Sequence, residues 1–399
     1  MEWKEVRLGD VCTRVCSGGT PKSTNLSYYG GEIPWLNTKE IDFNRIYSTE
    51  KTITDSGLNN SSAKWIVPNT ITVAMYGATA GKSCIVKVPM TTNQACCNLA
   101  INDKVADYEF VYYSLKNDYT TLASLANGGA QQNLNAQIIK DYVLKMPSLA
   151  DQHRIASILS SLDRKIELNN KINADLEEMA QAIFKNWFVD FEPFKDGKFV
   201  DSELGMIPEG WKVISLSEIM KYNGGSQPPA SEFIDTYQEG YIRFIQIRDY
   251  DNDSHITYIP ISKRNKLCDE LDIMIARYGA ALGRICWGLK GAYNVALAKV
   301  TPIKSYYREY LRCYLNTSYF YQSINNKGAR CAQSGFNQSD INSYMIAFPI
   351  DETVVMNFND LCSSIMDKRL SLKYESSRLS LLRDTLLPRL MSGELEVPE

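Results

Sequence analysis

Four stretches of this 399-residue chain occur twice, in the same order and about 200 residues apart. The first copies lie at residues 3–11 (WKEVRLGDV), 71–82 (ITVAMYGATAGK), 93–95 and 131–147, and the second copies at 211–219, 273–284, 294–296 and 333–349. Chance rarely supplies four ordered matches at nearly one spacing. The sequence therefore predicts two copies of one structural unit, related by a pseudo-twofold internal repeat.

Each copy reads as a mixed α/β lobe followed by a long helix. Short alternating runs such as residues 70–74 favour strands, whereas residues 108–125 and 307–325 favour helices. We expect an α+β fold in which two long antiparallel, coiled-coil-like helices separate two lobes. The expected segments are a first lobe at 1–150, a central spacer helix at 151–192, a linker at 193–205, a second lobe at 206–350 and a C-terminal spacer helix at 351–399.

Heptad spacing of apolar residues supports the two helices and predicts which faces pack together. The predicted seam consists of Ile155, Leu162, Asn169, Leu176 and Ile183 in the first helix and Phe358, Ile365, Leu372, Leu379 and Leu386 in the second. A plain helical hairpin would give the same pattern. At 1.5 Å per residue, however, a helix from about 151 to 188 extends roughly 55 Å, which suits a spacer. Asparagines in a seam set register more often than they add stability.

Composition places the chain among globular proteins without a membrane span or an export signal. The longest apolar runs are too short to cross a bilayer, so we expect no membrane partner and a cytoplasmic location. The ten cysteines form no CxxC pair, and only His153 and His255 could join them. We therefore expect reduced thiols and no metal site.

The net charge of −3 conceals a slight basic excess in each lobe. Residues 1–150 carry 14 Lys and Arg against 13 Asp and Glu, and residues 206–350 carry 16 against 13. Any phosphate contacts must then come from local clusters, because neither lobe has an overall basic field.

No catalytic motif is evident in the chain. It contains no GxxxxGK[ST] or GxGxxG loop, no GxSxG elbow and no HExxH helix. The single Pro-Pro, at Pro228 and Pro229, lacks the neighbours of an adenine methyltransferase motif. We therefore predict no catalytic residues, although a divergent nuclease core remains an alternative.

Polar loops next to the repeated glycines are the candidate nucleic-acid contacts. Glycines allow close backbone approach to phosphate, terminal cations neutralise it, and Gln, Asn, Arg and Lys can bond to base edges. The candidates are Lys39, Tyr76, Lys82, Gln131, Gln132, Asn133, Arg248, Arg277, Tyr278, Arg284, Arg330 and Gln333. Two alternatives stay open: the glycines could serve only a tight turn, and any single polar side chain could be merely solvated.

Four further stretches resemble the specificity subunits of type I restriction-modification systems. They are residues 147–159 (PSLADQHRIASIL), 181–191 (QAIFKNWFVDF), 204–211 (LGMIPEGW) and 386–395 (LLPRLMSGEL). The resemblance extends over the whole chain, including its order of lobe, helix, lobe and helix. Two departures are that the second helix opens with Val355, Met356, Asn357 and Phe358 instead of Gln-His-Arg, and that Lys368 and Glu375 lie on its seam side. They suggest weaker or different partner contacts there.

This resemblance implies a non-catalytic subunit that binds double-stranded DNA. Its two target-recognition domains would each read half of an interrupted site, with the paired helices fixing the gap. It also implies assembly with two methyltransferase subunits, which bind S-adenosylmethionine, and with restriction-translocase subunits, which use ATP and Mg²⁺. This chain itself would hold no cofactor. The competing interpretations are a self-contained restriction enzyme with an unrecognised nuclease core and a helical scaffold that does not bind DNA.

Overall fold

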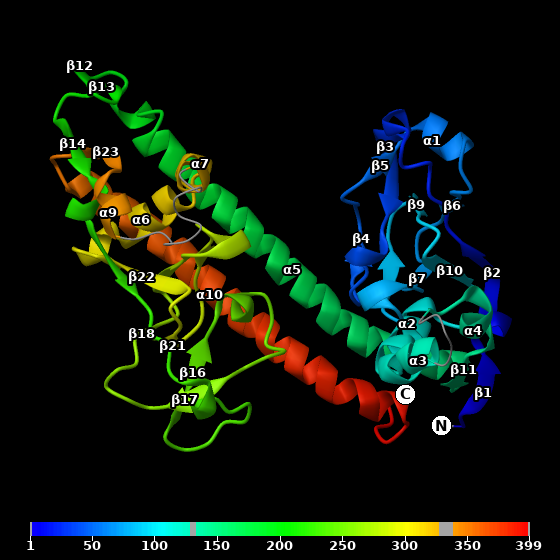
Figure 1. Cartoon of the computed structure of the whole chain (residues 1–399). Helices are drawn as coiled ribbons and strands as arrows, with labels where there is room; N and C mark the ends of the chain where they lie inside the picture. The colour runs from blue at the N-terminus through cyan, green and yellow to red at the C-terminus, as the bar shows by residue number, and fades with distance from the viewer. Residues whose placement is uncertain (1, 128–132, 327–337, 398–399) are drawn as a thin grey trace. The chain divides into compact units, whose positions relative to one another are not determined.

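A computed structural model describes residues 2–127, 133–326 and 338–397. The chain divides into two compact units, Met1–Glu167 with Ser377–Glu399, and Leu168–Ser376. Each unit contains one α/β lobe together with parts of both long helices, α5 (Leu149–Phe188) and α10 (Thr353–Met391) (Figure 1).

Within residues 2–127 and 133–148, the first lobe contains three sheets and four short α-helices. Its strands are β1 (Lys4–Arg7), β2 (Cys12–Ser17), β3 (Tyr29–Leu36), β4 (Arg45–Ile46), β5 (Thr52–Ile53), β6 (Trp65–Ile66), β7 (Ile71–Ala74), β8 (Ser83–Val86), β9 (Met90–Thr92), β10 (Cys96–Ile101) and β11 (Val143–Met146). Its helices are α1 (Asp55–Asn59), α2 (Tyr108–Asn117), α3 (Tyr119–Ser124) and α4 (Ala136–Asp141).

Within its described residues, the second lobe has strands that correspond to those of the first except β4, and it has an additional hairpin. Its strands are β12 (Phe199–Ser202), β13 (Gly205–Pro208), β14 (Trp211–Ser215), β15 (Met220–Gly224), β16 (Tyr241–Ile245), β17 (Tyr258–Pro260), β18 (Leu267–Cys268), β19 (Ile273–Ala276), β20 (Ile285–Cys286), β21 (Gly291–Tyr293), β22 (Leu297–Pro302) and β23 (Met345–Pro349). Its helices are α6 (Arg308–Leu315), α7 (Ser318–Asn326) and α9 (Gln338–Asn342).

The two lobes share one sheet topology, which confirms the internal repeat. The order β2-β10-β7-β8 returns as β15-β22-β19-β20, the order β5-β3-β9-β6 returns as β17-β16-β21-β18, and the pair β1-β11 returns as β14-β23. The parallel pairing in the sheet β5-β3-β9-β6 also recurs: β3 runs parallel to β9, and in the second lobe β16 runs parallel to β21. The first lobe differs by adding β4 to its largest sheet.

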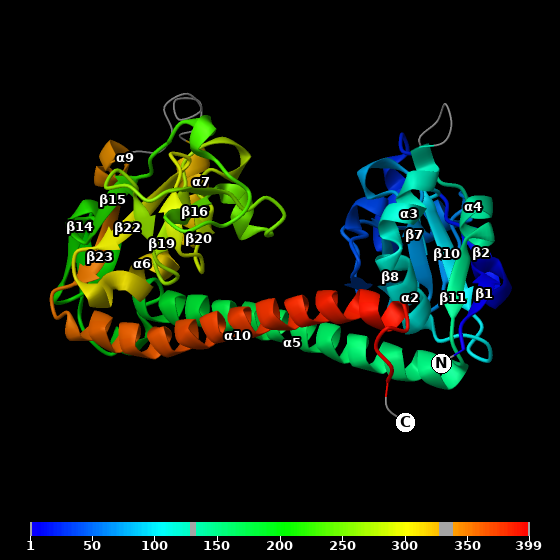
Figure 2. The same cartoon turned by 90° about the horizontal axis from the view of Figure 1, so that it is seen from below.

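Within each unit, α5 and α10 lie side by side and run antiparallel, as predicted (Figure 2). Asp163 of α5 pairs with Arg383 of α10 at 2.7 Å. Farther along, Glu177 of α5 pairs with Arg369 of α10. Residue numbers therefore rise along one helix as they fall along the other.

The seam between the helices is polar at its middle. Asn169 is fully buried and donates from its Nδ2 to Glu375 Oε2 at 2.9 Å and to Ser376 Oγ at 3.4 Å. Glu375 thus takes part in the helix pair through a polar contact, while the expectation of weaker or different partner contacts along this seam stays a prediction. Lys368, by contrast, is exposed. A buried amide requires a partner, so this layer favours one register over its neighbours.

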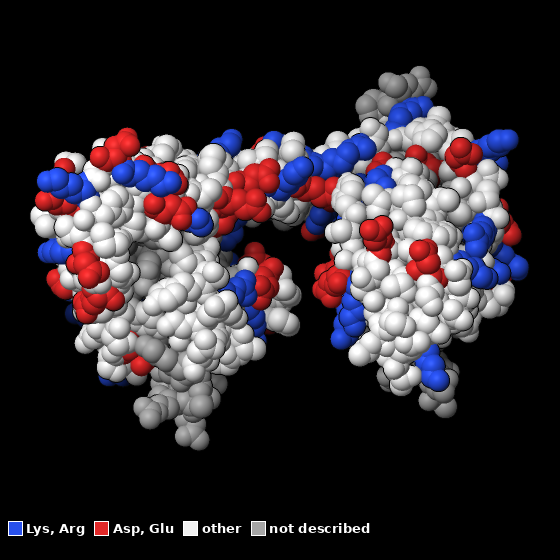
Figure 3. Space-filling model, turned by 90° about the horizontal axis from the view of Figure 1, so that it is seen from above, with Lys and Arg blue, Asp and Glu red and all other residues white. Residues whose placement is uncertain are grey.

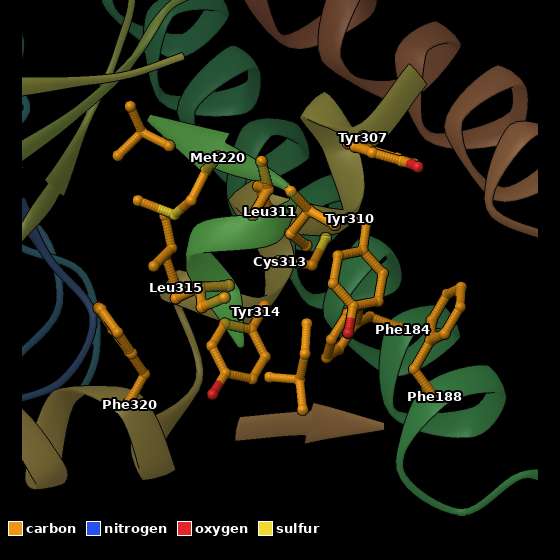
Figure 4. Close-up of a cluster of buried hydrophobic side chains, with 14 of the residues drawn as sticks. Phe184, Phe188, Met220, Tyr307, Tyr310, Leu311, Cys313, Tyr314, Leu315 and Phe320 are labelled. Carbon is orange, nitrogen blue, oxygen red and sulfur yellow. The ribbon is translucent and has the colours of Figure 1, made fainter. Parts of the chain in front are cut away.

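Each lobe's core includes residues from the start of one long helix and the end of the other. In the second unit, Phe184 and Phe188 of α5 pack against Tyr310 of α6, with ring centroids 5.3 and 4.9 Å apart (Figure 4). Phe358, near the start of α10, lies 5.0 Å from Phe188 in the same cluster.

The first unit repeats this arrangement with the helices exchanged. Ile155 and Leu159 from the start of α5 share a core with Leu387 and Leu390 from the end of α10. Gly393, two residues after the end of α10, has a φ of +75°, and a Cβ on it would come within 2.6 Å of Trp3 Nε1. The end of the chain therefore packs against its beginning.

Two segments differ from the sequence-based boundaries. Helix α5 ends at Phe188 rather than continuing to residue 192, and Phe191 adopts a left-handed φ of 55° that helix geometry does not allow. The segment expected as a linker, 193–205, contains strand β12 and the first residue of β13, which pair as a hairpin. Ser202 Oγ donates to the carbonyl of Gly205 at 2.6 Å and closes its turn.

Candidate DNA interface

In each lobe, the repeated glycine stretch forms a tight turn between two antiparallel strands. The 3₁₀ turn η4 (Gly77–Thr79) joins β7 to β8, and η10 (Gly279–Ala281) joins β19 to β20. Gly77 has a φ of +77°, and a Cβ there would meet nothing within 4 Å. The turn therefore needs glycine for its backbone conformation and not for space. The tight-turn alternative accounts for this glycine.

The amide hydrogens that follow the turn are already used within it. The N–H groups of Ala80, Gly81 and Lys82 donate to carbonyls of Gly77, Ala74 and Thr79 at 2.8–3.1 Å. The N–H groups of residues 282–284 repeat the pattern. These amides are not free to bind phosphate, and the expectation that the glycines let other backbone N–H groups approach phosphate stays a prediction. The cationic side chains that follow the turns are another group that could bind phosphate.

Those cations, Lys82 and Arg284, are each held by an aspartate from another loop of the same lobe. Lys82 Nζ lies 2.5 Å from Asp42 Oδ1, and an Arg284 guanidinium nitrogen lies 2.7 Å from Asp251 Oδ1. The hydrogen bond from Arg284 lowers the pKa of Asp251 below its usual range. Both ion pairs are partly solvent-exposed, unlike the pairs in the core.

The loops that supply the aspartates also carry two other predicted residues. Lys39 lies in the 3₁₀ turn η3 (Thr38–Glu40) and Arg248 in η9 (Ile247–Tyr250), and both are exposed. A capping box closes each turn, between Asn37 and Glu40 in the first lobe and between Gln246 and Asp249 in the second.

The capped turns η3 and η9 lie beside the glycine turns η4 and η10 of their lobes. In the first lobe Thr79 Oγ1 donates to the carbonyl of Thr38 at 3.0 Å, and in the second the Arg284–Asp251 pair makes the connection. The structure therefore brings Lys39 together with Lys82, and Arg248 together with Arg284.

Tyrosines flank both glycine turns, and an arginine is present only in the second. Tyr76 is exposed, whereas Tyr278 is partly buried. Arg277 lies over the rings of Tyr278 and Tyr222, at 5.1 and 5.8 Å from their centroids, and donates to the carbonyl of Val295 at 3.3 Å. The first lobe has a buried methionine, Met75, at the matching position. This position is thus a chemical difference between two otherwise similar turns.

The remaining candidates fall mostly outside the described ranges. Gln131, Gln132, Arg330 and Gln333 belong to the segments that the structure does not describe. Asn133 is exposed, and the N–H of the next residue, Leu134, donates to the carbonyl of Met75 at 2.9 Å. That bond places Asn133 close to Tyr76.

The glycine turns and the long helices lie at opposite ends of the same hairpins. In the first lobe, β8 runs from the glycine turn towards Ile46 of β4, and the adjacent Arg45 donates to Glu167 of α5 at 2.9 Å. In the second lobe, Trp287 directly follows β20, and its ring lies under Arg369 of α10 at 4.6 Å. The candidate residues therefore cluster at the end of each lobe that faces away from its helices.

A buried polar network attaches the first lobe to the helices. Asp163 of α5 accepts from Tyr113 of α2 at 2.6 Å and from Arg383 of α10 at 2.7 Å. Arg45 contacts Glu109 at 3.2 Å in the same network. Burial, together with the Asp163 carboxylate, raises the pKa of Tyr113, which remains a protonated donor. These charged groups neutralise one another, and their hydrogen bonds join the first lobe to the two helices.

Asp42 and Asp251 are the site residues that sequence reasoning missed. They end matching heptapeptides, residues 36–42 (LNTKEID) and 245–251 (IQIRDYD), which share the order apolar, amide, any, basic, acidic, any, Asp. Their offset of 209 lies just outside the spacing of the other repeats. A search that allowed a slightly wider spacing would have found them.

On the face of the molecule that Figure 3 shows, charged side chains lie in groups of both signs. On the face in Figure 3, basic and acidic side chains alternate with uncharged areas on each lobe. Within residues 2–127, 133–326 and 338–397, no group of three or more His, Cys, Asp or Glu side chains is placed to hold a metal ion. The helices of these same ranges include none with both the length and the apolarity to cross a membrane.

Comparison with known proteins gives a consistent picture. The family profile described as "Type I restriction modification DNA specificity domain" matches residues 1–178 and 208–368. The chain is 29% identical to the type I restriction enzyme MjaIX specificity subunit of Methanocaldococcus jannaschii, over 100% of this chain and 94% of that protein. It is 23% identical to the HindI specificity subunit of Haemophilus influenzae, over 99% and 100% of the two chains.

A solved structure resembles the fold. The crystal structure of a type I restriction-modification S subunit from M. genitalium superposes with a TM-score of 0.62, covering 98% of this chain and 96% of that one. The sequence identity is 18%, so this likeness concerns the fold alone.

Proposed function

The chain belongs to the family of type I restriction-modification DNA specificity subunits, and we propose that each of its lobes reads one half of an interrupted DNA site. The observation that carries this proposal is the pair of matching turns. Both lobes place a cation, Lys82 or Arg284, at the end of one tight turn and a second basic residue on the neighbouring turn. Around this shared framework the side chains differ, as two readers of different half-sites require.

The side chains divide by the chemistry that each can offer to DNA. The N–H groups of residues 80–82 and 282–284 are occupied, whereas the side chains of Lys82 and Arg284 are cations at the edge of their turns and suit phosphate. Arg277, which stacks on Tyr278 and Tyr222, presents a fixed guanidinium and suits paired hydrogen bonds to guanine. Gln131, Gln132, Arg330 and Gln333 stay candidates from the sequence alone.

The remaining partners follow from the family. We propose that this chain contributes recognition, while two methyltransferase subunits that bind S-adenosylmethionine modify adenine. Restriction-translocase subunits that use ATP and Mg²⁺ would cut the DNA. The chain would then be a non-catalytic, cytoplasmic component that holds no cofactor of its own, with the helix pair setting the gap between half-sites.

Exchanging one lobe tests the proposal directly. Residues 206–350 are replaced by the matching lobe of a relative, and methylated adenines are mapped in cells that carry the hybrid, the parent or neither. One half of the methylated motif should change while the other half stays the same. Exchange of residues 1–150 from the same relative is the matched control and should change the opposite half.

Three results would contradict the proposal. A change in both halves after a single exchange would show that the lobes do not read independently. Metal-dependent cleavage by the purified chain alone would favour a self-contained nuclease. Absence of DNA binding, alone and with partner subunits, would favour a scaffold.

A further inference from the structure

Two exposed aspartates occupy equivalent positions beside the cations of the glycine turns. Asp42 lies 40 residues before Lys82, and Asp251 lies 33 residues before Arg284. The cation differs between the lobes, but the aspartate and its distance from the preceding capping box do not. Both lobes keep the aspartate although the cation that it pairs with is Lys in one lobe and Arg in the other. This points to a role for the carboxylate itself.

A carboxylate and a DNA phosphate offer the same bond to a cation. Each presents anionic oxygens that accept short charge-assisted hydrogen bonds from ammonium or guanidinium groups. The Asp42 and Asp251 side chains are 68% and 54% exposed, and those of Lys82 and Arg284 are 26% and 38% exposed, so solvent reaches both members of each pair. A phosphate can therefore approach from where the carboxylate now binds.

The exposure of these pairs also makes them easy to exchange. An ion pair between exposed side chains contributes about 0–1 kcal/mol, so little is lost when its partner changes. The buried pairs of the same chain differ, since the Arg45 and Glu109 side chains are only 3% and 11% exposed. A phosphate could not reach that pair without opening the core.

We propose that Asp42 and Asp251 occupy, in the DNA-free lobes, the place of a DNA phosphate, so that each lobe exchanges an internal ion pair for a phosphate contact when it binds. This inference rests on the proposed function, because it presupposes that the glycine turns face DNA. Neutralised cations give little affinity for random DNA. The aspartates would thus lower the affinity of each lobe for random DNA until other residues of the lobe contact the DNA.

Substitution of each aspartate by its neutral isostere tests the exchange. The variants are Asp42→Asn and Asp251→Asn, made in the full chain within its methyltransferase complex. Binding is measured by fluorescence anisotropy on a duplex that carries the methylated motif and on one that lacks it. Each variant should bind both duplexes about two- to fivefold more tightly, which is the range set by one exposed ion pair.

Matched controls separate the exchange from a general loss of negative charge. Asp141→Asn in the first lobe and Asp269→Asn in the second remove aspartates of similar exposure that pair with Arg7 and Lys290. Their gain should be smaller. In Lys82→Ala and Arg284→Ala backgrounds, the gain from the matching Asn substitution should disappear, because no cation remains to be released.

The outcomes distinguish this inference from the function on which it rests. Weaker binding by the Asn variants would show that the aspartates only position the cations and would overturn the exchange. A gain that equals the controls, or that persists without the cation, would overturn it as well. If the unaltered complex binds neither duplex, the proposed function itself fails.

Discussion

At the scale of single residues, the two lobes differ at a few positions within a common backbone. Lys82 and Arg284 close equivalent turns, whereas Met75 is buried where the second lobe has Arg277. A phosphate contact tolerates Lys or Arg because it needs only a cation, whereas replacing an apolar side chain by a guanidinium changes which atoms can meet a base.

Removal of the turn cations tests their assignment to phosphate. Lys82→Ala and Arg284→Ala should each weaken binding to motif-bearing and random duplexes by the same factor. Each should also lower the slope of log affinity against log salt by about one unit, since one fewer phosphate is neutralised. Affinity measured on both duplexes from 50 to 200 mM salt checks this.

The exposed Lys290, which pairs with Asp269 outside the turns, is the matched control. Lys290→Ala should leave the salt slope unchanged. Loss of affinity for the motif-bearing duplex alone would instead assign Lys82 or Arg284 to a base.

At the scale of elements, the long helices are joined by polar pairs as well as by apolar seam residues. Asn169 pairs with Glu375, and Glu177 pairs with Arg369. Asn169 is fully buried and the Arg369 side chain is only 9% exposed, so both would lose their partners if one helix slid past the other. An unpaired buried charge such as that of Arg369 costs several kcal/mol. The helix pair is therefore suited to hold one register, as a spacer requires.

Lengthening both helices together tests the spacer role. Four residues are inserted after Asn170 in α5 and four after Tyr374 in α10, so that both polar pairs keep their partners. Four residues add about 6 Å of helix, and a base pair rises about 3.4 Å. The gap between half-sites should grow by one or two base pairs, with the half-site sequences unchanged, as read by methylation mapping.

An insertion in α5 alone is the control for register. It separates one member of the polar pairs from its partner and should reduce assembly instead of shifting the gap. An unchanged gap in a doubly lengthened complex that still methylates DNA would contradict the spacer role.

At the scale of the whole molecule, the first unit is not a continuous piece of chain, whereas the second is the single segment Leu168–Ser376. The first unit combines residues 1–167 with 377–399, so a helix that follows the second lobe in sequence completes the core of the first. Leu390 and Phe358 lie on the same helix α10, and both are fully buried, but in different cores.

Truncation of these two residues should therefore loosen different lobes. Leu390→Ala is expected to cost about 2–5 kcal/mol and Phe358→Ala about 3–5 kcal/mol, because each leaves a cavity. Hydrogen exchange read by mass spectrometry should rise in α2 for Leu390→Ala and in α6 for Phe358→Ala. Each variant serves as the control for the other, and faster exchange in both helices for either variant would contradict this division.

The sequence by itself determined the repeat and the two long helices, whereas the full set of seam residues stays a prediction. Heptad spacing and ordered repeats are periodic patterns that can be recognised in the order of the residues. Ile155 and Phe358 are buried because each lies on the apolar face of its helix. The cations of the glycine turns were also visible, since each ends a repeated stretch.

Only tertiary structure decided what those cations meet, because Asp42 and Asp251 come from loops 40 and 33 residues away. It likewise decided that Glu375 pairs with Asn169 and that the N–H groups of residues 80–82 and 282–284 are occupied. Such contacts depend on which distant segments pack together, and no local pattern encodes that.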